Sequence, residues 1–287
     1  MSDLVSRFAK YEDLHQSVMH AGVLRDLGWS KEGVPGSYIY FRTLGPFSVA
    51  KLQRTKEIDL AWLKQFKKSH HTLTTYLEPG LTYQSSTSIG IKAEPFAHSC
   101  TSLIDLLPTE QEILNKFSQK TRYNIVRTLK KDELKITSTN LDKLSTSQLS
   151  DFYTLHKNWS KQKNVIGYSK ELLDATIKNY GKNGDLHLAY LGQDLVGALL
   201  ILYHDSVATY WAAFASPSGY KSFAPTLLTW TAIQKAKENK SEIFDFGGIY
   251  DPRYPKMYSR WIGFTKFKSG FNPTVISYPP TALQLFW

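Results

Sequence analysis

Residues 186–214 read LHLAYLGQDLVGALLILYHDSVATYWAAF, and this stretch decides the fold. It contains three apolar runs of strand length: 186–191, 195–203 and 207–214. The runs are separated by Gly192-Gln193-Asp194 and His204-Asp205-Ser206, which are residue types that favour tight turns. The pattern predicts an antiparallel meander of three strands.

The segments around the meander extend it into a domain. Helical patterns precede it at 145–161 and 170–180, and a helix at 224–239 and a strand at 243–246 follow it. Helices, a meander, a helix and a strand form the element order of a GNAT-type acyltransferase fold. The first half shows a weaker version of this alternation, with a helix at 6–20, strands at 37–42, 47–52, 71–77 and 102–107, and helices at 58–68, from 108 and at 119–131.

We therefore predict an α/β (α+β) protein with two GNAT-like domains in tandem and a cleft between them. The first domain spans residues 1–140 and the second spans 141–287. The last residues are expected to pack back on the first domain.

Composition limits the function. The chain has 287 residues with 35 basic and 25 acidic side chains, and its net charge of +10 favours an anionic partner. A single cysteine, Cys100, excludes an intramolecular disulfide and fits a reducing compartment. Residues 1–7 lack the apolar core of a signal peptide, and the best apolar run, 195–203, is too short to span a bilayer. We expect a soluble cytoplasmic protein.

Two segments near the C-terminus could carry chemistry. The buried strand at 243–246, which contains Asp245, is followed by Gly247 and Gly248, which allow the backbone to approach a ligand closely. Residues 263–271 then place Lys268 between phenylalanines, where partial desolvation would strengthen the field of its ammonium. A strand, a turn and an amphipathic segment with Lys268 at the core edge would explain the same residues.

Three other segments leave alternatives open. The helix at 119–131 could hold phosphates, or it could be a solvated surface helix; its basic residues include Lys120, Arg122, Arg127 and Lys130. Tyr210 and Trp211 should point to opposite faces of their strand, so one could line a cleft, although both could be core residues. The loop 216–225 precedes a helix but lacks the glycine pattern of acetyl-CoA enzymes, so it is not expected to bind pyrophosphate.

The histidines lack the spacing of metal ligands, and the chain has neither a Gly-x-Ser-x-Gly elbow nor a Walker loop. We therefore expect no metal, no cofactor and no covalent nucleophile.

Over nearly its whole length the chain resembles the Fem family of peptidoglycan bridge-forming aminoacyltransferases, especially the short FemX type. The resemblance rests on short motifs in a shared order: 26–31, 42–46, 77–79, 101–106, 112–127, 223–230, 245–249 and 267–271. It implies transfer of an amino acid from aminoacyl-tRNA to the stem-peptide amine of a UDP- or lipid-linked muropeptide, in cell wall biogenesis. Peripheral contact with the inner membrane face would follow from a lipid-linked acceptor, and no stable protein partner is implied.

The resemblance also implies roles for individual residues. Phe267 and Lys268 would be the catalytic residues beside the transferring acyl group, and Lys268 would stabilise the oxyanion or the departing tRNA hydroxylate. The first domain would bind the acceptor, and the second would carry out acyl transfer. The substrate-binding residues would be Trp29, Lys31, Tyr210 or Trp211, Gly247, Gly248 and Tyr250. The tRNA phosphates would meet Lys120, Arg122, Arg127 and Lys130.

Two departures from the family pattern stand out. An arginine that the short type carries just before the aromatic position is absent from 204–207, and no long helical hairpin is inserted. Two rival functions remain: a GNAT-type acyltransferase that uses another donor on a glycan or small amine, and a non-catalytic RNA- or muropeptide-binding protein.

Overall fold

The computed structural model describes residues 3–83 and 89–286, and the chain divides into two compact units. The first unit comprises residues 1–101, 248–262 and 275–287, and the second comprises 102–247 and 263–274. The expected domain limit at residues 140 and 141 falls inside the second unit, and the last residues of the chain belong to the first unit.

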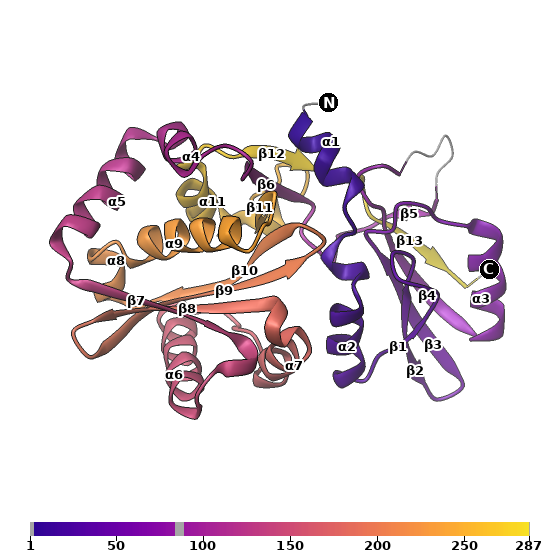
Figure 1. Cartoon of the computed structure of the whole chain (residues 1–287). Helices are drawn as coiled ribbons and strands as arrows, with labels where there is room; N and C mark the ends of the chain where they lie inside the picture. The colour runs from indigo at the N-terminus through magenta and orange to yellow at the C-terminus, as the bar shows by residue number, and fades with distance from the viewer. Residues whose placement is uncertain (1–2, 84–88, 287) are drawn as a thin grey trace. The chain divides into compact units, whose positions relative to one another are not determined.

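The first unit is built on a six-stranded sheet (Figure 1). Its order is β1 (Ser30–Glu32), β2 (Ile39–Leu44), β3 (Phe47–Gln53), β4 (Thr72–Glu78), β13 (Ala282–Leu285) and β5 (Ile91–Lys92). β3 and β4 are parallel and are joined by α3 (Leu60–Ser69), whereas the other neighbouring strands are antiparallel.

Helices cover both faces of this sheet (Figure 1). Strand alternation sends Ile39 into a core with Leu63 and Phe66 of α3, and sends Tyr40 into a core with Leu24 of α2 (Val18–Asp26). The single helix predicted over 6–20 is wrong. It is divided into α1 (Asp3–Lys10), η1 (Leu14–Gln16) and α2, because the side chains of Asp13 and Ser17 each cap a new helical start.

Most of the seven-stranded sheet belongs to the second unit, and the sheet confirms the predicted meander. The strand order is β12 (Thr274–Ser277), β6 (Cys100–Asp105), β11 (Ile243–Gly248), β10 (Val207–Ala215), β9 (Asp194–His204), β8 (Gly184–Leu191) and β7 (Leu134–Asn140). β8, β9 and β10 run antiparallel, and the predicted helix α9 (Ala224–Glu238) connects β10 to its parallel neighbour β11.

Helices also lie on both faces of the second sheet (Figure 1). The apolar helix α9 packs on β8, β9 and β10, with α5 (Gln119–Lys131) beside it, and α6 (Thr146–Lys163) packs on the opposite face. The remaining helices are α4 (Glu110–Lys116), η2 (Leu141–Lys143), α7 (Lys170–Tyr180), η3 (Gly181–Asn183), α8 (Pro217–Lys221), α10 (Pro255–Tyr258), η4 (Ser259–Trp261) and α11 (Ile262–Ser269). None of the helices in the described ranges has the length and apolarity needed to cross a bilayer.

Candidate functional site

The candidate site lies where the parallel strands β10 and β11 separate. Their pairing covers only three residues on each strand and ends at Thr209 and Asp245, although both strands continue. β10 carries an irregularity between Tyr210 and Ala212, and Gly247 has a φ of +66°. A Cβ on Gly247 would lie 3.1 Å from the carbonyl oxygen of Tyr210, so both this close approach and the positive φ favour glycine. The separated strands leave room for side chains of α11.

Lys268 of α11 enters this region. Its side chain is buried, with 6% exposure, and its Nζ lies 5.3 Å from the ring centre of Tyr210 and 4.8 Å from that of Phe264. Helical spacing explains the second contact, because residues four apart share one face. Burial lowers the pKa of Lys268 to about 7, although the Asp245 carboxylate opposes this shift.

A lysine in this state has two chemical uses. At neutral pH the ammonium and the amine are both populated, so Lys268 can stabilise a negative oxygen or accept a proton. The surrounding rings keep water away, and a low local dielectric strengthens the field of the ammonium. The site therefore fits a reaction in which negative charge develops on oxygen.

Phe267 supports the helix that carries Lys268. Its partly buried ring packs on the core cluster and lies 5.4 Å from the ring of Phe271. The end of α11 is also tied to α5, since the backbone N–H of Ser118 donates to the carbonyl oxygen of Gly270 at 2.9 Å. Core packing and this hydrogen bond together fix the position of Lys268.

Asp245 has a structural role at the end of β11. Its Oδ1 accepts a hydrogen bond from the backbone N–H of Gly247 at 2.8 Å, which caps the turn at the strand end. The negative charge of the same carboxylate raises the pKa of Lys268 and so opposes the effect of burial.

Tyr210 and Trp211 point to different sides of the sheet. The Tyr210 ring lies 5.9 Å from that of Phe246, and burial raises the pKa of its hydroxyl. Trp211 stacks on Tyr168, with ring centres 4.8 Å apart and an interplanar angle of 21°. Tyr210 is therefore the member of the pair that faces Lys268.

More aromatic rings and cations gather around α8. The indole Nε1 of Trp159 donates to the hydroxyl of Tyr220 at 3.4 Å, and the Lys163 ammonium lies 4.7 Å from the Tyr220 ring centre. Tyr168 and Tyr220 are exposed. We call Trp159, Tyr168 and Tyr220 the aromatic surface of the second unit. Exposed rings next to cations form a type of surface that binds single-stranded nucleic acid.

A cavity of about 290 Å³ lies on the other side of α8. Three of its lining side chains are cationic: Arg127 and Lys131 of α5, and Lys221 of α8. Ser218, Ser222 and Phe223 also line it, and the one acid, Glu133, pairs with Lys131 at 3.4 Å. We call it the basic cavity. Its charge and its hydroxyl groups suit a phosphate.

The four basic residues predicted on α5 therefore separate. Arg127 lines the basic cavity, whereas the Nη1 of Arg122 donates to the carbonyl oxygens of Asn115, at 3.0 Å, and Phe117 at the end of α4. Lys120 and Lys130 are exposed. The interpretation of the helix as a plain solvated surface fits Lys120 and Lys130 better than Arg127.

Two predicted substrate residues, Trp29 and Lys31, belong to the first unit. The Lys31 ammonium lies 3.7 Å from the ring centre of Tyr38. Trp29 packs on the α2 core, and the ammonium of Lys51 lies 4.8 Å from the Trp29 ring centre. Burial lowers the pKa of Lys51 to about 8, although Glu78 opposes this shift.

Gly248 and Tyr250 also belong to the first unit. A side chain at Gly248 would collide with the Trp261 ring and would lie 2.8 Å from the Cβ of His98. The following loop is anchored by Asp251: burial alone would raise the pKa of this carboxyl, but hydrogen bonds from Arg253 and Ser99 lower it to about 2. Tyr250 is thus held on a fixed loop.

Sequence reasoning missed part of this arrangement. Lys131 could have been found, because it lies four residues after Arg127 on the same helix face. Tyr220 and Lys221 were passed over because their loop lacks a known phosphate-binding motif. Trp159 and Tyr168 carry no local signal, since only the fold brings them to α8.

Within residues 3–83 and 89–286, no group of three or more His, Cys, Asp or Glu side chains is arranged to hold a metal ion.

Comparison with known proteins adds a family and a fold. Residues 192–281 match the model of the FemAB family, which confirms the resemblance inferred from the sequence. No curated protein matches the chain.

Solved structures share the fold at low sequence identity. The structure described as FemX has a TM-score of 0.79 at 13% identity, and the match covers 99% of this chain and 96% of that one. The C-terminal domain of an Agrobacterium fabrum protein described as a lysylphosphatidylglycerol synthetase has a TM-score of 0.66 at 14% identity, covering 96% and 89%. A tandem GNAT protein from the clavulanic acid biosynthesis pathway has a TM-score of 0.50 at 8% identity, covering 88% and 79%. The predicted pair of GNAT-like domains is confirmed.

Proposed function

Since residues 192–281 carry the FemAB family region on a FemX-like fold, we propose that this protein transfers an amino acid from aminoacyl-tRNA to the stem-peptide amine of a peptidoglycan precursor. At the level of the family it is an acyltransferase of peptidoglycan bridge formation. The tRNA donor, the muropeptide acceptor and the residue roles belong to the proposal.

The observation that carries the proposal is the burial of Lys268 at the separation of β10 and β11, inside the family region. An aminoacyl ester is already activated, so the acceptor amine can attack its carbonyl carbon directly. The C–N bond forms, the carbonyl oxygen becomes an oxyanion, and the C–O bond to the ribose then breaks. The amine loses a proton and the leaving ribose oxygen gains one, so atoms and charge balance.

Lys268 acts on the oxygen atoms in this scheme. Its ammonium stabilises the oxyanion and then the leaving ribose oxygen, at a place where the surrounding rings exclude water. Its pKa of about 7 makes proton donation to that oxygen easier than from an ordinary lysine. Tyr210 and Gly247 form the nearby walls of the acyl site.

The donor RNA binds a surface of the second unit in this proposal. The basic cavity with Arg127, Lys131 and Lys221 suits phosphates, and the aromatic surface suits unpaired bases. α8 joins the two, since Tyr220 belongs to one and Lys221 to the other. Both features support a single-stranded RNA end as the donor carrier.

The direct test incubates the purified protein with UDP-linked or lipid-linked muropeptide and either charged tRNA or acetyl-CoA. We expect mass gain only with charged tRNA, and the added mass identifies the amino acid. A product formed only from acetyl-CoA would refute the proposal.

Lys268→Met tests the catalytic role. We expect the transfer rate to fall about 10²–10³-fold, as for loss of one oxyanion-stabilising group, while RNA binding stays intact. The matched control is Lys266→Met, since Lys266 is an exposed cation on the same helix. Equal rates for both variants would remove Lys268 from catalysis.

Charge removal tests the RNA surface. We expect Arg127→Met with Lys221→Met to weaken binding of uncharged tRNA and to make its affinity less dependent on salt. Lys143→Met removes an exposed charge outside the basic cavity and should change neither by much. Identical salt slopes for the double variant and the control would place the RNA elsewhere.

A second acceptor class is favoured by one comparison, the likeness to the domain of a protein described as a lysylphosphatidylglycerol synthetase. The donor chemistry would be the same, but a lipid hydroxyl would replace the amine. Phosphatidylglycerol vesicles added as a parallel acceptor distinguish the two, because only one acceptor should gain the labelled amino acid.

A further inference from the structure

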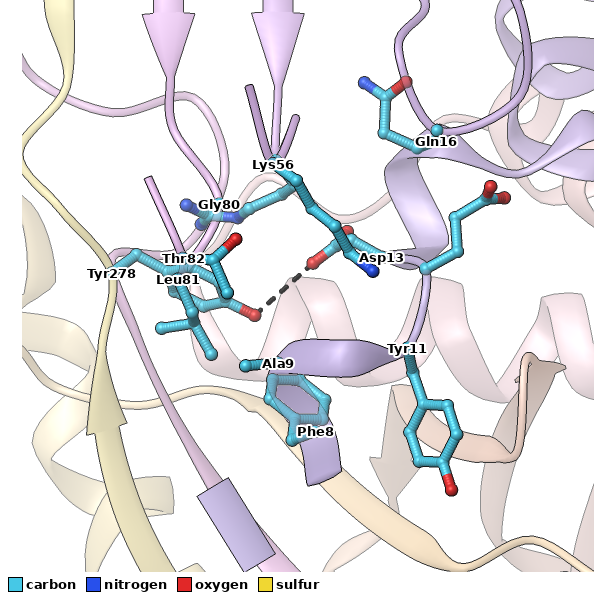
Figure 2. A pocket seen from close by; sticks show the side chains of 13 residues that line it. Phe8, Ala9, Tyr11, Asp13, Gln16, Lys56, Gly80, Leu81, Thr82 and Tyr278 are labelled. Carbon is cyan, nitrogen blue, oxygen red and sulfur yellow. Dashed lines mark hydrogen bonds between the residues drawn. The ribbon is translucent and has the colours of Figure 1, made fainter. Parts of the chain in front are cut away.

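The first unit has a pocket of its own, at the carboxyl ends of β3 and β4 (Figure 2). Its volume is about 110 Å³, and its walls come from residues just after the two strands and from the segment between α1 and η1. β3 and β4 are parallel strands joined by α3, as β10 and β11 are joined by α9. The carboxyl ends of parallel strands are where open α/β sheets bind ligands. Within its own unit, the pocket therefore has the same topological place as the Lys268 site.

The wall of the pocket is closely packed around Arg54. Arg54 is only 4% exposed, its guanidinium lies 3.5 Å from the Tyr278 ring centre, and its Nη2 donates to the carbonyl oxygen of His98. Its backbone has a φ of +61°, which is strained for a side-chain-bearing residue. A Cβ on Gly80 would lie 2.9 Å from the carbonyl oxygen of Thr55, so the two strand-end loops touch. Strain held in place by packing is common at binding sites.

Opposite charges line the pocket. Lys56 and Asp13 both line the pocket: the Lys56 ammonium donates to the carbonyl oxygen of Lys10, and the Tyr278 hydroxyl donates to the Asp13 carboxylate at 3.4 Å (Figure 2). Burial would raise the pKa of Asp13, but His15 and Arg54 hold it well below its usual range, so this group stays ionised. Among the described residues, the buried Nε of Arg54 has no hydrogen-bond partner.

The remaining walls combine apolar and polar side chains, and the polar ones include Glu12, Gln16 and Thr82. Phe8 and Ala9 of α1 line one side, and Leu81 lies on the loop after β4 (Figure 2). The pocket is far smaller than the several hundred Å³ of a cofactor or nucleotide site. A fitting ligand has a carboxylate for the cations, an N–H group for Asp13 and a short apolar side chain.

We propose that this pocket binds one small α-amino acid unit with a free carboxylate. The carboxylate faces Lys56 and Arg54, the N–H group faces Asp13, and the side chain contacts Phe8 and Leu81. A free amino acid and the C-terminal residue of a peptide share this chemistry. The pocket lies wholly in the first unit, so the proposal does not depend on the reaction at Lys268.

The experiment titrates the full chain by calorimetry and ligand-observed NMR. The probes are D-alanine, L-alanine, the dipeptide Ala-Ala, the amidated dipeptide and acetate. We expect saturable binding of alanine or of the dipeptide, and loss of binding when the carboxylate is amidated. Tight alanine binding would identify a free amino acid as the ligand, whereas binding of the dipeptide alone would identify a peptide end.

Two variants locate the binding. Lys56→Met should weaken it about tenfold or more, since a hydrogen bond to a charged group is lost, and Lys64→Met on α3 is the matched exposed control. Ala9→Leu fills the pocket from a helical position without changing any charge, and should abolish binding. The proposal is overturned if no probe binds, if acetate binds as tightly as alanine, or if both pocket variants bind like the control.

Discussion

The two units contain the same strand–helix–strand arrangement, but they differ in how far the two parallel strands remain paired. In the first unit, β3 and β4 stay paired up to Gln53 and Glu78, and the amide of Gln53 donates to the Glu78 carboxylate at 2.6 Å. In the second unit, β10 and β11 separate after Thr209 and Asp245. We call the boundary between two parallel strands a seam. The seam between β3 and β4 is closed by the buried pair of Gln53 and Glu78, and the seam between β10 and β11 is open around the buried Lys268.

The difference shows how one topology yields two kinds of site. The closed seam leaves space only beyond the strand ends, where loops form a small polar pocket. The open seam admits Lys268 between the strands' own side chains and desolvates its ammonium. The place of a site therefore follows from the topology, whereas its chemistry follows from how far the strands remain paired.

The largest effect on stability is expected from removing the lysine of the open seam. A buried lysine whose pKa is depressed binds fewer protons in the folded state, so it costs stability below pH 7, and this cost disappears as the pH approaches 10.5. Lys268→Met should therefore raise stability by several kcal/mol at most near pH 6–7, since one pKa unit is worth about 1.4 kcal/mol. The gain should shrink toward pH 10.

Thermal unfolding across this pH range measures the effect, with Lys266→Met as the control. A gain that stays constant with pH would mean that the ammonium of Lys268 is not desolvated.

Substitution of Glu78 should destabilise the closed seam between β3 and β4. This carboxylate is fully buried and accepts from Gln53 and, at 2.8 Å, from the backbone N–H of Ala97. Glu78→Ala leaves both donors without a partner, so we expect a loss of about 3 kcal/mol in the free energy of unfolding. Glu78→Gln keeps the shape and one acceptor and should lose less. Denaturant unfolding measures both, and equal losses would show that the retained shape of glutamine contributes nothing and that the carboxylate itself is needed.

The smallest effect concerns the glycine at the open seam. An alanine at position 247 would have to adopt a φ of +66° close to the Tyr210 carbonyl oxygen, which costs about 1–2 kcal/mol. Gly263 has nothing within 4 Å of an added Cβ and lies in α11, so Gly263→Ala should gain about 0.5–1 kcal/mol. Melting temperatures that move in opposite directions would support the seam geometry, and a stabilised Gly247→Ala would contradict it.

Local signals explain why much of the fold could be predicted. α5 and α7 have the predicted limits, because Ser118 and Ser169 cap their first turns. Val126 and Leu129 of α5, whose apolar side chains would suit a core face, are instead 42% and 56% exposed. The buried face of that helix includes Thr121, a polar residue that hydrophobic periodicity does not detect.

The two candidate sites also differ in how far the sequence predicts them. Lys268 could be proposed from its neighbours in the chain, although its pKa depends on Tyr210 and Phe264 being folded against it. The pocket of the first unit gives no such signal, since its hydrogen-bonded pair, Asp13 and Tyr278, is separated by 265 positions. Only the path of the chain brings these side chains together.

The insertion of β13 has a consequence for biosynthesis. Ala282–Leu285 pair with β4 on one side and with β5 on the other, so the sheet near the N-terminus stays incomplete until these residues leave the ribosome. The seven-stranded sheet needs nothing beyond β12, which ends at Ser277, so it can be completed earlier. The part of the chain translated first is thus the last to mature, and during that delay the bare edge of β4 is the surface most exposed to misassembly and chaperone capture.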